Sequence, residues 1–70
     1  MPPILRRGAT GADVERLQQD LSKLGYALAF SGMFDQDTEK AVMTFQQAHN
    51  LTVDGVVGSQ TGQKLGASLR

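Results

Sequence analysis

A threefold repeat of glycine is the feature that most constrains how this chain can fold. Gly8, Gly32 and Gly55 stand 24 and 23 residues apart. Three positions after each comes a residue suited to begin a helix, and three further on comes a β-branched residue. The two sets are Gly11, Asp35 and Gly58, then Val14, Thr38 and Thr61. Glycine takes positive φ at little steric cost, and Asp and Gly are accepted as N-caps. The repeat therefore predicts three tight turns, each leading into a helix.

Apolar residues recur at helical spacing after each turn. We expect helices over residues 12–24, 36–49 and 59–69, with Gly25 and Asn50 just beyond the ends of the first two. The expected inward residues are Val14, Leu17, Leu21 and Leu24, then Ala41, Val42, Phe45 and Ala48, then Leu65 and Leu69. Residues expected to close the ends of the core from outside the helices are Leu5, Phe34, Leu51, Val53 and Val57. No segment alternates cleanly as a strand, so the predicted fold is all-α, a compact three-helix bundle with ordered Gly-rich turns.

The length of 70 residues fits one domain, and residues 1–4 are expected to form a loose N-terminal tail. Lys and Arg total 7 and Asp and Glu total 7, a formal net charge of +0. A nucleic-acid binder needs a basic face, and an electrostatic membrane sensor does too, so this balance argues against both. No apolar run approaches the ~18 residues of a membrane span, and no signal peptide is evident.

Residues suited to catalysis are scarce. The chain has one histidine, His49, and no cysteine, so a multi-histidine or thiolate metal site is not expected. Asp35, Asp37 and Asp54 are explained first as helix-start or turn residues. We therefore expect no enzymatic activity, no bound metal and no cofactor.

Paired glutamines occupy matching places in the first two predicted helices. Gln18-Gln19 and Gln46-Gln47 follow Leu17 and Phe45, with an offset of 28 residues. Two interpretations are open. Gln18 and Gln46 either hydrogen-bond to loop backbone beside the core, or one of them lines a groove for a ligand rich in amides and sugars.

The order of these residues resembles the small peptidoglycan-binding module of bacterial and phage cell-wall hydrolases. The resemblance covers residues 5–69, nearly the whole chain. It rests on Leu5-Arg-Arg-Gly8, Gly11-x-x-Val14-x-x-Leu17-Gln18, Leu24-Gly25-Tyr26, Gly32-x-Phe34-Asp35-x-x-Thr38-x-x-Ala41-Val42-x-x-Phe45-Gln46 and Leu51-x-x-Asp54-Gly55-x-x-Gly58-x-x-Thr61. This chain departs from the family pattern at three places: Ser31 stands where Asp is common, Asp35 where Gly is usual, and Gly62-Gln63 near a frequent aromatic residue.

The resemblance implies non-catalytic binding to peptidoglycan, both stem peptide and glycan. It also implies a covalently linked or partner hydrolase that is held at the wall, as in the N-terminal module of a phage endolysin. The expected place of action is the periplasm or cell wall, and the expected state is a monomer. The alternative is a protein-interaction or inhibitory module, because a similar module forms part of the pro-segment of some metalloproteinases.

Candidate ligand-binding residues follow from the chemistry of that ligand, which offers amides, carboxylates and sugar hydroxyls. Arg7 would pair with a stem-peptide carboxylate, and Tyr26 would stack on an apolar face. Thr38, Gln46 and Asp54 would add neutral and acidic hydrogen-bonding groups. Each of the five also has a purely structural interpretation. Tyr26, for example, would cover the end of the first helix.

Overall fold

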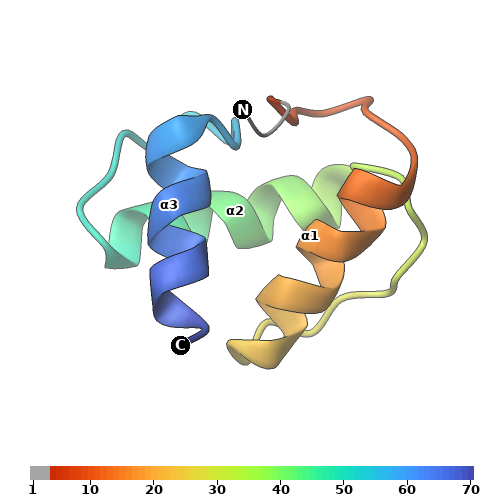
Figure 1. Ribbon diagram of the computed structural model, residues 1–70. Coiled ribbons are helices and arrows are strands. Elements are labelled where there is room, and N and C mark those ends of the chain that lie inside the picture. The colour runs from red at the N-terminus through yellow and green to blue at the C-terminus, as the bar shows by residue number, and fades with distance from the viewer. Residues whose placement is uncertain (1–3) are drawn as a thin grey trace.

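The three expected helices all form. The structure is a computed structural model that describes residues 4–70, and its helices are α1 (Ala12–Lys23), α2 (Gln36–Ala48) and α3 (Ser59–Ser68) (Figure 1). Each begins where the repeat predicts and ends one residue earlier than expected. The described residues contain no strand, only two isolated bridges, Leu5 with Val57 and Thr10 with Met33. The all-α prediction is therefore confirmed.

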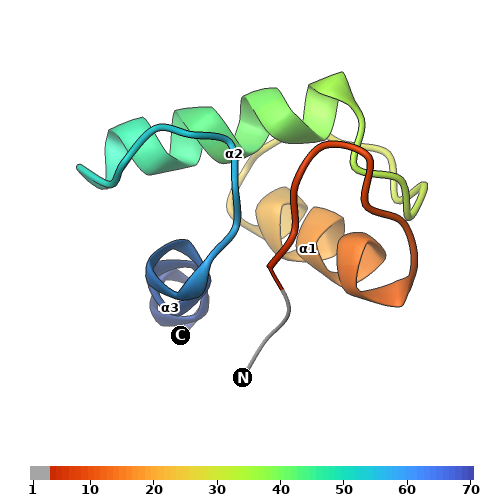
Figure 2. The ribbon, with the colours of Figure 1, turned by 90° about the horizontal axis from the view of Figure 1, so that it is seen from above.

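The helices form a splayed bundle in which α1 and α3 lie on the same side of α2 (Figures 1 and 2). The segment that precedes α1 lies beside the segment that precedes α3, and the two are joined at Leu5 and Val57. There the amide nitrogen of Leu5 lies 3.1 Å from the Val57 carbonyl, and that of Val57 lies 2.8 Å from the Leu5 carbonyl. This pair of hydrogen bonds ties the N-terminal segment to the start of α3. Of the tail predicted for residues 1–4, only the exposed Ile4 is within the described part of the chain.

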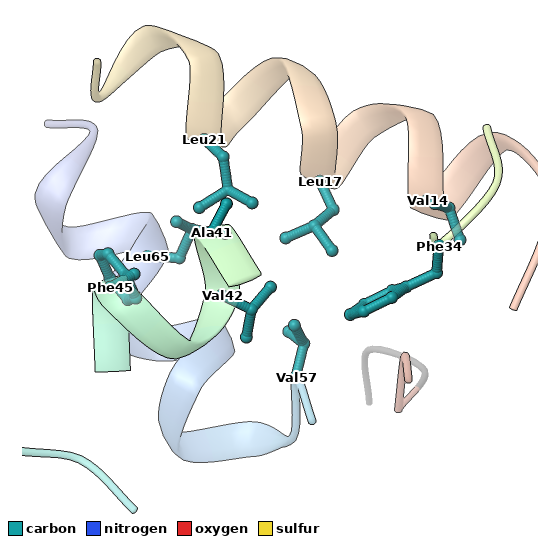
Figure 3. Packing of buried hydrophobic residues seen from close by; sticks show 9 residues of the cluster. All are labelled: Val14, Leu17, Leu21, Phe34, Ala41, Val42, Phe45, Val57 and Leu65. Carbon is teal, nitrogen blue, oxygen red and sulfur yellow. The ribbon is translucent and has the colours of Figure 1, made fainter. Parts of the chain in front are cut away.

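The core lies where the three helices meet, and it takes residues from every helix and from two loops. Figure 3 shows the nine buried apolar residues: Val14, Leu17, Leu21, Phe34, Ala41, Val42, Phe45, Val57 and Leu65. Leu5, Leu24 and Leu51 pack against them and are half-buried. Three of the predicted core residues lie outside this cluster, and one of them is Leu69, the half-buried C-cap of α3. Ala48, in the last turn of α2, is exposed, and Val53 is 44% exposed because the loop turns Leu51 rather than Val53 toward the core.

The helix ends follow the predicted capping. Asp35 caps α2, since its Oδ1 accepts hydrogen bonds from the Thr38 amide at 3.0 Å and the Thr38 hydroxyl at 2.9 Å. Gly11 and Gly58 precede α1 and α3 without a side chain to cap them. Asn50, beyond α2, has φ of 57°, the left-handed conformation expected there. No helix among residues 4–70 is both long and apolar enough to cross a lipid bilayer.

Candidate functional site

Gln46, one of the predicted ligand contacts, is buried and its amide is fully occupied. Its Nε2 donates to Asp54 Oδ1 at 2.9 Å and to the Val56 carbonyl and Thr61 Oγ1 at 3.0 Å each. Its Oε1 accepts from the backbone amides of Asp54 at 3.2 Å and Gly55 at 3.0 Å. The side chain is only 1% exposed. Gln46 therefore fastens the loop between α2 and α3 to the first turn of α3, and the fold accounts for it without a ligand.

Gln18 makes the same arrangement one repeat earlier. Its Nε2 donates to the Met33 carbonyl and Thr38 Oγ1 at 3.0 Å each and to Ser31 Oγ at 3.3 Å. Its Oε1 accepts from the Gly32 amide at 2.9 Å. Both Gln18 and Thr38 are buried, so Thr38, another predicted ligand contact, lies inside this network. We call the two networks the glutamine locks.

Asp54 holds the same place in its lock that Ser31 holds in the other. Asp54 Oδ1 accepts from the Val56 amide at 2.9 Å, and Ser31 Oγ accepts from the Met33 amide at 3.2 Å. Each oxygen also accepts from the amide of its glutamine. Serine replaces aspartate here without loss of the turn, because a hydroxyl oxygen accepts the same two hydrogen bonds. The Asp54 residue is otherwise exposed to solvent.

The other two predicted ligand contacts lie at opposite ends of α1. Arg7 precedes α1 and is exposed, and its Nη1 lies 3.2 Å from Glu39 Oε1. Tyr26 follows α1, is half-buried and packs against the core. A 12-residue helix spans about 18 Å, so these two side chains do not face one ligand group. Of the five predicted residues, the structure brings Gln46 and Asp54 into direct contact, and none of the five lines the groove between α1 and α3 described next.

A groove lies between α1 and α3, and no residue predicted to bind a ligand lines it. Its volume is about 180 Å³ and it opens to solvent. The floor is apolar, and three of its residues belong to the core cluster of Figure 3: Leu17, Val57 and Leu65. Leu5 closes the groove beside Val57, to which it is hydrogen-bonded. Gly62 completes the lining on the α3 side.

Charged side chains from α1 form the rim of this groove. Asp13, Arg16 and Asp20 are three and four residues apart, so they share one side of the helix. Arg16 Nε lies 3.4 Å from Asp20 Oδ1, with the Arg16 side chain 74% exposed and that of Asp20 14% exposed. The spacing of these charges was visible in the sequence. It is also the ordinary pattern of a solvated helix face, so only the position of α3 identifies the groove.

The described residues hold no cluster of three or more His, Asp or Glu side chains that could bind a metal ion. His49 is the C-cap of α2, and its ring centroid lies 4.4 Å from that of Phe45. This position is the structural one expected for a histidine at the negative end of a helix.

The two carboxylates that fix the turns make the stability of the fold depend on acid. The Thr38 amide and hydroxyl hold the pKa of Asp35 below its ordinary value of 3.8, and the Val56 amide, with the Gln46 amide, does the same for the pKa of Asp54. A carboxylate with a lowered folded pKa contributes stability above its unfolded pKa and loses it as pH falls through the folded value. We therefore expect the Tm to be level above about pH 5 and to fall progressively below about pH 4.

Thermal melts from pH 2 to pH 6 test this expectation. The variant with Asp35→Ala and Asp54→Ala should melt lower throughout but with a flatter acid limb. Asp37→Ala is the matched control, because Asp37 is also in the first turn of α2 but its carboxylate makes no hydrogen bond within residues 4–70. A wild-type Tm unchanged between pH 6 and pH 2 would contradict the role assigned to Asp35 and Asp54.

Comparisons with known proteins agree on one family. The family model described as "Putative peptidoglycan binding domain" matches residues 10–65. The spore cortex-lytic enzyme of Bacillus cereus is 40% identical over 63 residues, which cover 89% of this chain and 24% of that enzyme.

Solved structures extend the likeness to three dimensions. The N-terminal domain of SleB superposes with a TM-score of 0.95 at 35% identity, covering 100% of this chain and 97% of that domain. The Burkholderia AP3 phage endolysin gives a TM-score of 0.91 at 40% identity, covering 97% of this chain and 26% of the endolysin. The chain spans about a quarter of the length of the cortex-lytic enzyme and of the endolysin.

Proposed function

The chain belongs to the family of peptidoglycan-binding domains, and from this premise we propose that it binds bacterial peptidoglycan and holds an attached or partner hydrolase on the sacculus. The main support is the family match over residues 10–65 together with a solvent-open groove between α1 and α3. The relatives that are hydrolases carry this module as a fraction of their length. Tethering raises the effective concentration of a catalytic domain at its substrate without any chemistry in the module itself.

The place of action we propose is the cell wall, and the module itself is proposed to be non-catalytic and monomeric, with no nucleic-acid or membrane partner. Arg7, Tyr26 and Asp54 retain exposed atoms and remain secondary candidates for ligand contact. Incubation of the chain with purified sacculi is expected to release no muropeptides. Soluble muropeptides detected by chromatography would show instead that the domain has an activity of its own.

Sedimentation with purified insoluble sacculi tests the binding proposal. Gly62→Leu should reduce retention about tenfold, because a side chain at position 62 would occupy the groove where a ligand enters. An added Cβ at Gly62 meets no atom within 4 Å, so there is room at this position for a side chain to begin. Gly66→Leu is the matched control, since Gly66 is also in α3 and open but does not line the groove.

The outcomes separate the alternatives. Retention of the wild type and of Gly66→Leu with loss of Gly62→Leu supports binding through the groove. Equal retention of all three would place the contact elsewhere on the domain. If the wild type stays in the supernatant, the peptidoglycan proposal fails and a protein-interaction or inhibitory module becomes the better interpretation.

A further inference from the structure

The groove between α1 and α3 is small, and its size limits what it can hold. Its volume of about 180 Å³ is below the roughly 300–1,000 Å³ of pockets that enclose a whole drug-sized ligand. It therefore accommodates one residue of a larger polymer rather than a disaccharide. No aromatic residue among residues 4–70 lines it, so this part of the chain gives it no flat platform on which a sugar ring stacks. The floor of Leu17, Val57 and Leu65 suits an aliphatic chain instead.

The rim supplies charges of both signs with hydrogen-bonding capacity left over. The Asp13 carboxylate makes no hydrogen bond within residues 4–70. Arg16 bonds to Asp20 through Nε, and neither of its Nη atoms bonds to another described residue. An exposed guanidinium with two free nitrogens is suited to bind a carboxylate, and an unpaired carboxylate is suited to bind an ammonium. Arg16 follows Asp13 by three residues on the same side of α1.

We infer that this groove binds the zwitterionic end of a diamino acid, with the aliphatic chain on the apolar floor, the ammonium on Asp13 and the carboxylate on Arg16. Within stem peptides, meso-diaminopimelate has this chemistry, because its free end carries an ammonium and a carboxylate on one carbon. L-lysine at the same position has the ammonium alone. The inference rests on the proposed function, since it specifies which part of peptidoglycan enters the groove.

Asp20 has a different role in this arrangement. Its side chain is largely buried and its Oδ1 lies 3.4 Å from Arg16 Nε, so it orients the guanidinium and leaves the Nη atoms toward solvent. The rim then has one free carboxylate and one positioned cation, which match a neutral zwitterion in both sign and number. A ligand with only an ammonium would leave the guanidinium without a partner.

The test uses two soluble muropeptide monomers that are identical except for meso-diaminopimelate or L-lysine at the third stem position. Binding to the wild-type chain is measured by calorimetry or by NMR shifts. We expect the diaminopimelate form to bind about tenfold more tightly, the ratio produced by one added charge-assisted hydrogen bond in a solvent-open site. Arg16→Gln should remove this preference while leaving the lysine form unaffected, and Asp13→Asn should weaken both forms.

Controls keep the result specific. Gln has nearly the helix propensity of Arg, and Arg16 is 74% exposed, so Arg16→Gln should fold normally. Lys40→Gln removes an exposed cation from α2, away from the groove, and should change nothing. Equal affinity of the wild type for the two muropeptides, or a preference that survives Arg16→Gln, overturns the inference. In either case retention on sacculi still decides the proposed function separately.

Discussion

Gln46→Leu is expected to destabilise the domain by about 2–5 kcal/mol, a large part of its stability. Leucine fills similar space but leaves the Gly55 amide and the Thr61 hydroxyl buried without a partner, and each such group costs about 1–3 kcal/mol. A 70-residue domain has a free energy of unfolding of roughly 4–10 kcal/mol. The variant should therefore be only marginally folded at 37 °C. Urea denaturation, followed by circular dichroism, measures the change.

Two further variants identify the cause. Gln47→Leu changes the exposed neighbour of Gln46 and should alter stability by less than about 0.5 kcal/mol. Adding Thr61→Val to Gln46→Leu removes the unpaired hydroxyl, so the double variant should be no less stable than Gln46→Leu alone. If Gln46→Leu costs under 1 kcal/mol, the lock does not hold the loop. The prediction also means that loss of sacculus binding by a Gln46 variant would reflect unfolding rather than a lost ligand contact.

The glutamine locks explain why the repeat is visible in the sequence and why it differs in its first copy. Thr38 and Thr61 each accept a hydrogen bond from a glutamine on the preceding helix. The first copy has Val14 in the same position, where it is fully buried in the core. No helix precedes α1 among residues 4–70, so this part of the chain has no glutamine that would donate a hydrogen bond to a hydroxyl at position 14. A repeat of turn and helix, with threonine only where a partner exists, is a local pattern and could be recognised from sequence.

The chemistry of the predicted ligand residues does not show from sequence whether they bind a ligand or hold the loops of the fold. Gln46, Thr38 and Asp54 carry the polar groups that a ligand site needs, and the same groups satisfy the loop backbone. Both interpretations of the glutamines were open from spacing alone. Backbone amides that need partners are not visible in a sequence, whereas the structure shows which of them face each glutamine.

The groove between α1 and α3 could not be predicted from the sequence, because its shape depends on contacts between distant segments. It depends on the angle at which α1 and α3 diverge across α2 and on the contact of Leu5 with Val57, which are 52 residues apart. Neither follows from local periodicity. The available signals were Gly62, three residues before the buried Leu65, and the charges at positions 13, 16 and 20 beside the apolar stripe of α1. Together these residues line the gap that remains between α1 and α3.

Gly55→Val is expected to lower the free energy of unfolding by about 3 kcal/mol or more, because it combines backbone strain with a steric clash in the turn that Gln46 holds. Gly55 has φ of +72°, a conformation that β-branched residues rarely adopt. A Cβ there would also lie 3.1 Å from Cγ of Glu39, so the Glu39 side chain on α2 must shift, whereas Cγ of Met43 at 3.5 Å would be in ordinary contact. The Gly55 amide donates to Gln46, so a shift in the turn weakens the lock as well.

Substitutions at other glycines isolate the contribution of backbone conformation. Gly32→Val, at φ of +74° but with only the Gly11 carbonyl oxygen at 3.5 Å, should cost somewhat less than Gly55→Val. Gly55→Asn should recover much of the loss, because asparagine tolerates the left-handed region. Gly66→Ala should instead raise the free energy of unfolding of the domain by about 1 kcal/mol, because Gly66 is within α3 and a Cβ there meets open space. Thermal melts of the four variants decide the matter: Gly55→Val and Gly32→Val melting with the wild type would mean that the turns do not require positive φ.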